Sequence, residues 1–374
     1  MRLAGKRIVF RADASLEMGS GHVMRCLTLA DALRELGAEC QFVCRAHQGH
    51  LAELIGARGH ACHLLAALPG AELAVSDSPQ LSSTDHAHWL GCGWEQDAAQ
   101  TQAILADCQP DWLVVDHYAL DARWERLMRP HVGNIMAIDD LADRAHECDL
   151  LLDQNLGRQP DDYRELVPSD CMLLVGPRYA LLRPEFAALR EYSLQRRQTP
   201  ALKQVLITMG GVDQLNATGR VLEALRQVPL PDDCRICVVM GAKSPWLAEV
   251  EALAVTLPWP TEVRVNVSNM AELMAQSDLA IGAAGGTAWE RCCLGLPTIL
   301  VVLASNQREA ATHLAATEAA HVVASVDEIP GSVARLLLSL CREQSILVQL
   351  SSASAAISDG VGAQRVLTAW EKMQ

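Results

Sequence analysis

The chain has 374 residues, half of them apolar and 20% charged, and its net charge is −14. This length and apolar content exclude a disordered chain, and at roughly 150 residues per domain they predict two domains. The acidic balance argues against a nucleic-acid or membrane-surface binder, because both need a basic face. No apolar run reaches the ~20 residues that span a bilayer. Arg11 and Asp13 come too early for a secretory leader, so we expect a cytoplasmic protein without membrane insertion.

The first half of the chain alternates short β-branched runs with amphipathic stretches. This alternation predicts a parallel sheet covered by helices. Residues 69–94 interrupt it with a polar, turn-rich stretch, which we interpret either as a mobile loop over a site or as a plain surface insertion. The strand-like runs of this half are residues 6–13, 40–45, 61–65, 111–116, 134–139 and 149–155.

The same alternation begins again at residue 204, after a charged segment that has no strand pattern. We therefore predict two α/β domains in tandem with a cleft between them, over residues 1–190 and 204–358, joined by a linker at 191–203. The last helical stretch, residues 359–374, carries an apolar face. This stretch either packs back on the first domain or caps its own domain.

A glycine turn stands between the first predicted strand and a strong helix. Gly19 and Gly21 allow a tight turn, and the free amides at the helix start attract an anion, because the positive end of the helix dipole lies there. His22 follows directly, while Arg11 and Asp13 end the preceding strand. Ionisable groups are thus gathered at the carboxyl end of a parallel strand, where such folds bind ligands. The alternative is a histidine in an ordinary surface or capping role.

Two further glycine-rich turns mark the second predicted domain. Gly211 follows a strand and lets the backbone approach a phosphate closely, although an ordinary strand-to-helix turn has the same composition. Residues 282–290 end another strand with small side chains and place Glu290 in the first helical turn. Its carboxylate can accept two hydrogen bonds from a ribose diol, but the helix dipole alone also favours a glutamate there. Asn306 and Gln307 add neutral donors at the same predicted sheet edge.

Carboxylates cluster at two strand ends of the first predicted domain, with Asp116 at one and Asp139 and Asp140 at the next. Such pairs can bind a divalent metal. His117, however, points to the opposite face of an extended chain from Asp116 and cannot easily join a ligand set. We therefore expect no metal and no cofactor, and we assign these carboxylates structural and substrate-orienting roles.

Six segments of the chain stand out as motifs: GSGHVMR (19–25), VVDHYALDARWE (114–125), IDDLADRAHECDLLLDQN (138–155), GPRYALLRPEF (176–186), ITMGGVDQLN (207–216) and IGAAGGTAWERC (281–292). They resemble, in order, the motifs of the UDP-2,4-diacetamido-2,4,6-trideoxy-β-L-altropyranose hydrolases of pseudaminic acid biosynthesis, which are related to the MurG-like glycosyltransferases. The resemblance implies a metal-independent nucleotide-sugar hydrolase of two Rossmann-like domains in a glycosyltransferase-B arrangement, with UDP held mainly by the second. The family's catalytic histidine corresponds to His22, and the tyrosine of its DHY motif corresponds to Tyr118.

The implied reaction is displacement of UDP from an anomeric carbon by water, with inversion. UDP is a good leaving group once the protein holds its diphosphate charge. The attacking water needs a base near neutral pH, and an imidazole is suited to that role. His22 is therefore the expected base. Tyr118 is the second expected catalytic residue. We expect the sugar to be oriented by Arg11, Asp13, Tyr118, Asn155 and Arg183, and UDP to be held by Gly211, Thr287, Glu290, Asn306 and Gln307. Gly19 and Gly21 are expected to bind the substrate through their turn.

Two other functions fit the same features. In a glycosyltransferase of this architecture, His22 would deprotonate an acceptor hydroxyl instead of water. A nucleotide-sugar-binding module would use the same residues without turnover. In every case the expected partner is a small UDP-sugar, and only the hydrolase would release UDP at a useful rate without an acceptor.

Overall fold

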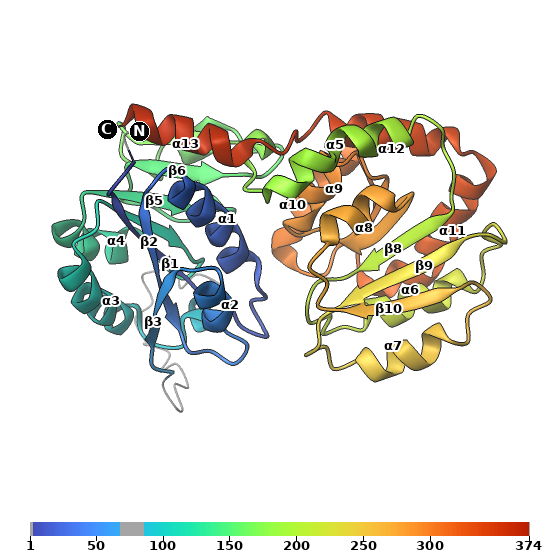
Figure 1. Ribbon diagram of the computed structural model, residues 1–374, viewed down its shortest axis with the longest axis horizontal. Coiled ribbons are helices and arrows are strands. Elements are labelled where there is room, and N and C mark those ends of the chain that lie inside the picture. Colours follow the sequence, from blue (N-terminus) through green and yellow to red (C-terminus); the bar gives the residue numbers. More distant parts are fainter. Residues whose placement is uncertain (1–2, 68–85, 374) are drawn as a thin grey trace. The chain divides into compact units, whose positions relative to one another are not determined.

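The computed structural model describes residues 3–67 and 86–373. It divides into two compact α/β units, each built on one parallel sheet (Figure 1). Unit 1 contains Met1–Leu181 and Ala363–Gln374, and unit 2 contains Leu182–Gly362. The predicted fold class, two Rossmann-like α/β domains, is confirmed. None of the helices in the described part of the chain has the length and apolar composition needed to cross a bilayer.

Unit 1 has a seven-stranded sheet in the order β3-β2-β1-β4-β5-β6-β7. The first strand pairs with both β2 and β4, so the chain builds outward from β1 in both directions. The carboxyl ends of β1 and β4 therefore form a topological switch point, where open α/β sheets bind ligands. The strands are β1 (Arg7–Ala12), β2 (Glu39–Arg45), β3 (Ala61–Leu65), β4 (Trp112–Asp116), β5 (Asn134–Ile138), β6 (Leu150–Asp153) and β7 (Met172–Val175).

Helices cover the unit 1 sheet over two hydrophobic clusters. One cluster joins α1 to the C-terminal helix α13, whose Trp370 meets Trp112 of β4 with ring centroids 4.6 Å apart. Helix α13, red in Figure 1, is thus part of the core of unit 1 although 181 residues of unit 2 precede it in the chain. The helices are α1 (Gly21–Glu35), α2 (Ala52–Ala57), α3 (Trp94–Cys108), α4 (Ala122–Met128) and α13 (Gly362–Lys372), with 3-10 turns η1 (Ala87–Leu90), η2 (Arg129–His131), η3 (Pro160–Tyr163) and η4 (Pro177–Tyr179).

Unit 2 repeats the design with six parallel strands in the order β10-β9-β8-β11-β12-β13. Its switch point lies between β8 and β11, and β12 is the next strand along. The strands are β8 (Gln204–Thr208), β9 (Arg235–Met240), β10 (Thr261–Val265), β11 (Leu279–Ala283), β12 (Thr298–Val301) and β13 (His321–Val323). The helices are α5 (Pro184–Arg196), α6 (Ala217–Leu225), α7 (Leu247–Ala254), α8 (Met270–Gln276), α9 (Thr287–Cys293), α10 (Arg308–Ala316), α11 (Ile329–Arg342) and α12 (Ser345–Ala355), with 3-10 turns η5 (Ser305–Gln307) and η6 (Val326–Glu328).

The linker predicted at residues 191–203 is wrong in its first half, because α5 continues to Arg196. Pro184 begins this helix at a position that needs no amide donor. Its charged residues bind other parts of unit 2 instead of solvent. Arg190 donates to the carbonyls of Ala355 at 2.7 Å and Ser358 at 2.9 Å, which lie at and beyond the end of α12, where helix carbonyls need partners.

The polar stretch predicted at residues 69–94 lies outside the described residues as far as residue 85. The remainder includes the short helix η1 and leads into α3 at Trp94.

Candidate functional site

The switch point of unit 1 brings His22 and Asp116 together. His22 stands in the first turn of α1, after β1, and Asp116 ends the neighbouring strand β4. Their Nδ1 and Oδ1 atoms are 2.6 Å apart. His22 is 7% exposed and Asp116 is fully buried, so the carboxylate contacts the ring on its buried side.

Arg25, one turn along α1, makes Asp116 a permanent carboxylate. Its Nε and Nη2 atoms donate to the two carboxylate oxygens, each at 2.7 Å. Burial alone would raise the pKa of Asp116, but Arg25 and His22 hold it well below its usual range. Because an ionised carboxylate only accepts hydrogen bonds, the hydrogen of a neutral His22 ring is assigned to Nδ1. The lone pair of Nε2 is then left to take a proton.

Tyr118 lies beside this pair with a fixed hydroxyl. Its ring meets the His22 ring edge-on, with centroids 4.6 Å apart and planes at 86°. The hydroxyl donates to Asp140 at 2.8 Å, and burial together with that carboxylate raises the pKa of Tyr118 well above its usual value. Asn155 donates to the Asp140 carbonyl at 3.1 Å. The tyrosine is therefore a neutral hydroxyl and not a base, and Asn155 belongs to the same cluster.

The prediction that Arg11 and Asp13 contact the sugar is wrong, because both side chains are fully buried. Arg11 pairs with Asp13 at 2.7 Å and with Asp97 of α3 at 2.6 Å. The same Asp97 oxygen also accepts from Arg45 at 2.7 Å. The charges pair with one another, because unpaired buried ions would be costly, although Oδ2 of Asp13 and Nε of Arg45 have no hydrogen-bond partner within the described part of the chain. Buried in this way, Arg11 and Asp13 brace the end of β1.

The glycine turn before α1 has the geometry that the sequence indicated. Gly19 adopts φ +81°, and its amide donates to the Ser15 carbonyl at 2.9 Å. Gly21 begins the helix, and a side chain at either glycine would project into open space. The first turn of α1 contains no acidic residue, so the positive end of its dipole stays uncompensated from within the helix.

Sequence reasoning missed two aromatic residues at this site. Trp89 of η1 stacks on Tyr118 with centroids 5.7 Å apart, and His86 contacts both rings. Both residues are partly exposed. They lie inside the polar stretch at residues 69–94, but nothing in their spacing connects them with Tyr118.

In unit 2, the three predicted UDP-binding turns follow the adjacent strands β8, β11 and β12. The first turn leads into a helix whose start is already capped. Asp213 accepts the amides of Ala217 and Thr218, each at 2.9 Å, so its carboxylate already caps the start of α6. A phosphate is therefore not expected on that helix start, and only the exposed backbone at Gly210 and Gly211 is left to approach it.

The second turn rests on a buried arginine. Arg291 is 1% exposed and donates to the Ala283 carbonyl at 2.6 Å and to the Thr287 hydroxyl at 3.3 Å. A Cβ at Gly282 would lie 2.6 Å from the Arg291 Nη1 atom, so only glycine fits over the guanidinium. Thr287 itself is exposed at the start of α9.

Glu290 is partly exposed on α9, and burial of its carboxyl raises the pKa to about 7. The positive charge of Arg183, the residue before α5, lowers this pKa and so opposes the effect of burial. Arg183 also pairs with Glu185 at 2.8 Å, and it belongs to unit 2 rather than to the His22 cluster. Its predicted role beside the sugar stays a prediction.

The third turn contains Asn306 and Gln307 in η5. Gln307 accepts the Leu303 amide at 3.0 Å through Oε1, which holds the turn and leaves its amide nitrogen as a donor. Asn306 is exposed.

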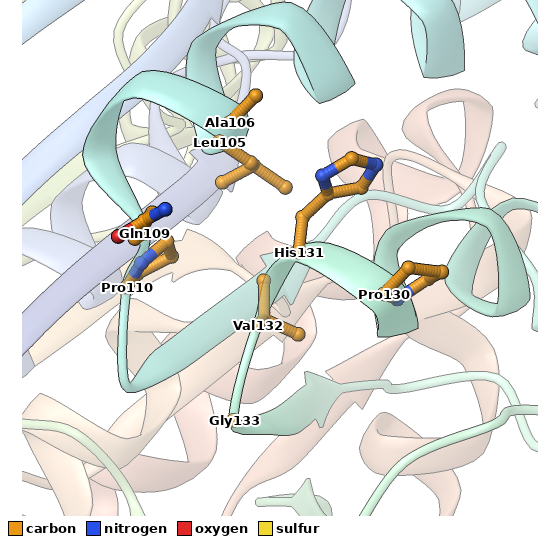
Figure 2. A pocket seen from close by; sticks show the side chains of 8 residues that line it. All are labelled: Leu105, Ala106, Gln109, Pro110, Pro130, His131, Val132 and Gly133. Atoms are coloured by element: carbon orange, nitrogen blue, oxygen red, sulfur yellow. The ribbon is translucent and has the colours of Figure 1, made fainter.

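Among the described residues, no group of three or more His, Cys, Asp or Glu side chains is placed to hold a metal. A hollow of about 370 Å³ lies at the amino ends of β4 and β5, the opposite ends of these strands from His22 and Asp116. Figure 2 shows the side chains that line it. It is lined by Leu105, Ala106, Gln109, Pro110, Pro130, His131, Val132 and Gly133, none of which is a candidate site residue.

Comparison with known proteins finds related sequences and folds. Residues 205–366 match the glycosyltransferase family 28 C-terminal domain. The chain is 25% identical over 310 residues to the UDP-2,4-diacetamido-2,4,6-trideoxy-beta-L-altropyranose hydrolase of Campylobacter jejuni, covering 83% of this chain and 96% of that protein. The resemblance predicted from the motifs is confirmed.

A second relative is the uncharacterized protein MJ1062 of Methanocaldococcus jannaschii. It is 25% identical over 309 residues, which are 81% of this chain but 57% of that protein, so the match spans little more than half of its length. Among solved structures, MurG of Acinetobacter baumannii has a TM-score of 0.69 at 16% identity and covers 98% of this chain and 99% of its own. This chain shares its fold.

Proposed function

We propose that the chain hydrolyses a UDP-linked 2,4-diacetamido-2,4,6-trideoxy sugar to UDP and the free sugar, without a metal. The observation that carries this proposal is the His22–Asp116 contact of 2.6 Å, with Arg25 on the same carboxylate. It leaves Nε2 of His22 as a base that is fixed in direction. The similarity to the Campylobacter hydrolase over nearly its whole length supports the choice of substrate.

In the proposed reaction, Nε2 of His22 removes a proton from water. The water oxygen forms a bond to the anomeric carbon, and the bond from that carbon to the UDP oxygen breaks with its electron pair on UDP. Asp116 stabilises the imidazolium that forms, as the buried aspartate does in serine hydrolases. The exposed turns of unit 2 hold the diphosphate, and Glu290 accepts the ribose hydroxyls when it is ionised.

A glycosyltransferase is the second candidate, because residues 205–366 match a glycosyltransferase domain. The same base would then remove the proton from an acceptor hydroxyl. Hydrolysis and transfer differ in one requirement, the acceptor.

Release of UDP without an acceptor tests the proposal. We expect the purified protein, in the presence of EDTA, to release UDP catalytically from UDP-linked 2,4-diacetamido-2,4,6-trideoxy sugars and far more slowly from UDP-GlcNAc. Coupled detection of UDP across a set of UDP-linked amino sugars measures this. Release that appears only with an added acceptor would establish the transferase, and activity that EDTA abolishes and Mg²⁺ restores would contradict the metal-free reaction.

The position of an oxygen label identifies the bond that breaks. Attack at phosphorus usually needs a cation over the phosphate oxygens. The arginine of the second turn, Arg291, is instead bound to the Ala283 carbonyl beneath that turn. In H₂¹⁸O we therefore expect the label in the sugar hydroxyl, unlabelled UDP by mass spectrometry, and the inverted anomer as the first product by NMR. Label in the β-phosphate would assign His22 to the phosphate side and refute attack at carbon.

A further inference from the structure

A row of aromatic rings begins at His22 and continues to partly exposed residues of unit 1. The His22 ring meets Tyr118 edge-on, with centroids 4.6 Å apart. On Tyr118 lies the Trp89 indole, 24° from parallel, with centroids 5.7 Å apart. His86 lies 4.4 Å from Trp89 and 5.2 Å from Tyr118. The Trp89 indole is therefore two ring contacts away from the proposed base.

Contacts on both sides of Trp89 fix the short helix η1 that carries it. On one side, His88 and Glu17 are joined through Nε2 and Oε1 at 2.7 Å, which ties η1 to the turn before α1. On the other side, Leu90 is buried in the core, and Gly91 follows with φ +71°. A Cβ at Gly91 would lie 2.7 Å from the His47 ring, so the chain passes close to neighbouring side chains there. Leu90 and the close packing at Gly91 therefore anchor the end of η1, whereas the exposed contact between His88 and Glu17 adds little.

Beside the nearly buried His22, the row of rings ends in residues that are partly exposed. His22 and Tyr118 are only 7% and 6% exposed, whereas Trp89 and His86 are partly exposed. The Tyr118 hydroxyl is already bound to Asp140. A ligand that approaches His22 along this row therefore meets the exposed part of the indole, an apolar ring that binds methyl and C–H groups through burial and dispersion.

We propose that Trp89 is a specificity-determining residue whose indole binds the methyl groups of the sugar. This inference rests on the proposed function, because the proposed substrate carries a methyl in each acetamido group and another at C6. A hexose with hydroxyls at C4 and C6 places polar groups there, and an indole face cannot accept them in hydrogen bonds of normal strength. Trp89 thus selects the deoxygenated, acetylated sugar, while the turns of unit 2 bind the UDP that both sugars share.

Binding measurements in a His22→Ala background test this without turnover. We expect Trp89→Leu to weaken binding of the UDP-linked diacetamido-trideoxy sugar by about 10-fold to 100-fold, the range for loss of small apolar contacts in a pocket. Binding of UDP alone stays unchanged, and Trp89→Phe retains most of the affinity for the sugar. In the protein with His22 intact, Trp89→Leu raises KM and leaves kcat.

Trp94→Leu is the matched control, because Trp94 is also partly exposed but lies against Arg123 at the start of α3. It leaves both affinities unchanged. If Trp89→Leu weakens UDP and UDP-sugar equally, or lowers kcat at constant KM, Trp89 supports Tyr118 or the fold and the inference is wrong. If the native protein releases no UDP, the proposed function fails, while the binding comparison still decides the role of Trp89.

Discussion

Replacement of His22 by alanine is expected to lower kcat by about 10²-fold to 10⁴-fold, the usual contribution of a positioned base. The loss arises because the other groups around Asp116 and His22 cannot take a proton from water. The Cys26 thiol contacts Asp116, but burial raises its pKa well above the usual value and keeps it protonated. Arg25 is permanently protonated, and Tyr118 is a neutral hydroxyl bound to Asp140. The Kd for UDP is expected to stay unchanged, since the proposed UDP contacts lie in unit 2. Steady-state kinetics and calorimetry with UDP measure the two effects.

The control for this variant is His63→Ala. His63 is a partly buried histidine of the same sheet, bound to Gln41 at 2.9 Å on the strands β3 and β2, away from the switch point. It should keep the native kcat. A His22→Ala protein with near-native kcat would remove His22 from the mechanism and leave the His22–Asp116 pair a structural contact.

Asp116→Asn is expected to lower kcat by about 10²-fold to 10⁴-fold, the upper value being the cost of the equivalent change in serine proteases. Two effects add. The amide no longer carries the charge that stabilises an imidazolium, and it can donate to Nδ1, which moves the ring hydrogen to Nε2 and removes the base. Arg25 also loses a charged partner at 2.7 Å, so thermal unfolding must be compared before the rates are interpreted.

Asp111→Asn is the matched control for Asp116→Asn. Asp111 immediately precedes β4, the strand that Asp116 ends, and its ion pair with Lys6 is partly exposed and of little energetic weight. Its kcat should equal that of the native protein. A ¹⁵N NMR spectrum of the ring nitrogens then separates the explanations for Asp116→Asn. A changed tautomer with unchanged KM supports positioning of the base, whereas a raised KM with unchanged kcat would contradict it.

The fold could be predicted from the sequence because strand and helix periods alternate without ambiguity. The run 204–210 corresponds to β8, and the helix pattern from residue 23 lies in α1. The linker could not be predicted, because a helix that binds its neighbours through arginine has the composition of a solvent-exposed segment. The Arg190 contacts with the carbonyls of Ala355 and Ser358 show why, since both partners come from more than 160 positions away.

The candidate site could be predicted only as far as single strand ends. The glycine turn places His22 at a helix start, and the family resemblance is what predicts its role as a base. Its partner Asp116 is 94 positions away, and only the strand order, with β4 beside β1, connects the two. Arg11 and Asp13 show the opposite error. Charge at a strand end indicates a ligand site only when the charge is left unpaired, and Asp97 of α3, which pairs with Arg11, could not be located from the sequence.

Helix α13 sets the order in which the two units can be completed on the ribosome. The strands of unit 1 are synthesised first, but Trp112 lacks its Trp370 partner until Leu182–Gly362 has also been made. Unit 2 comes from one continuous stretch and can close its core earlier, although it emerges later. A nascent chain stopped before α13 therefore exposes apolar surface around Trp112, the kind of surface that chaperones bind and that promotes aggregation.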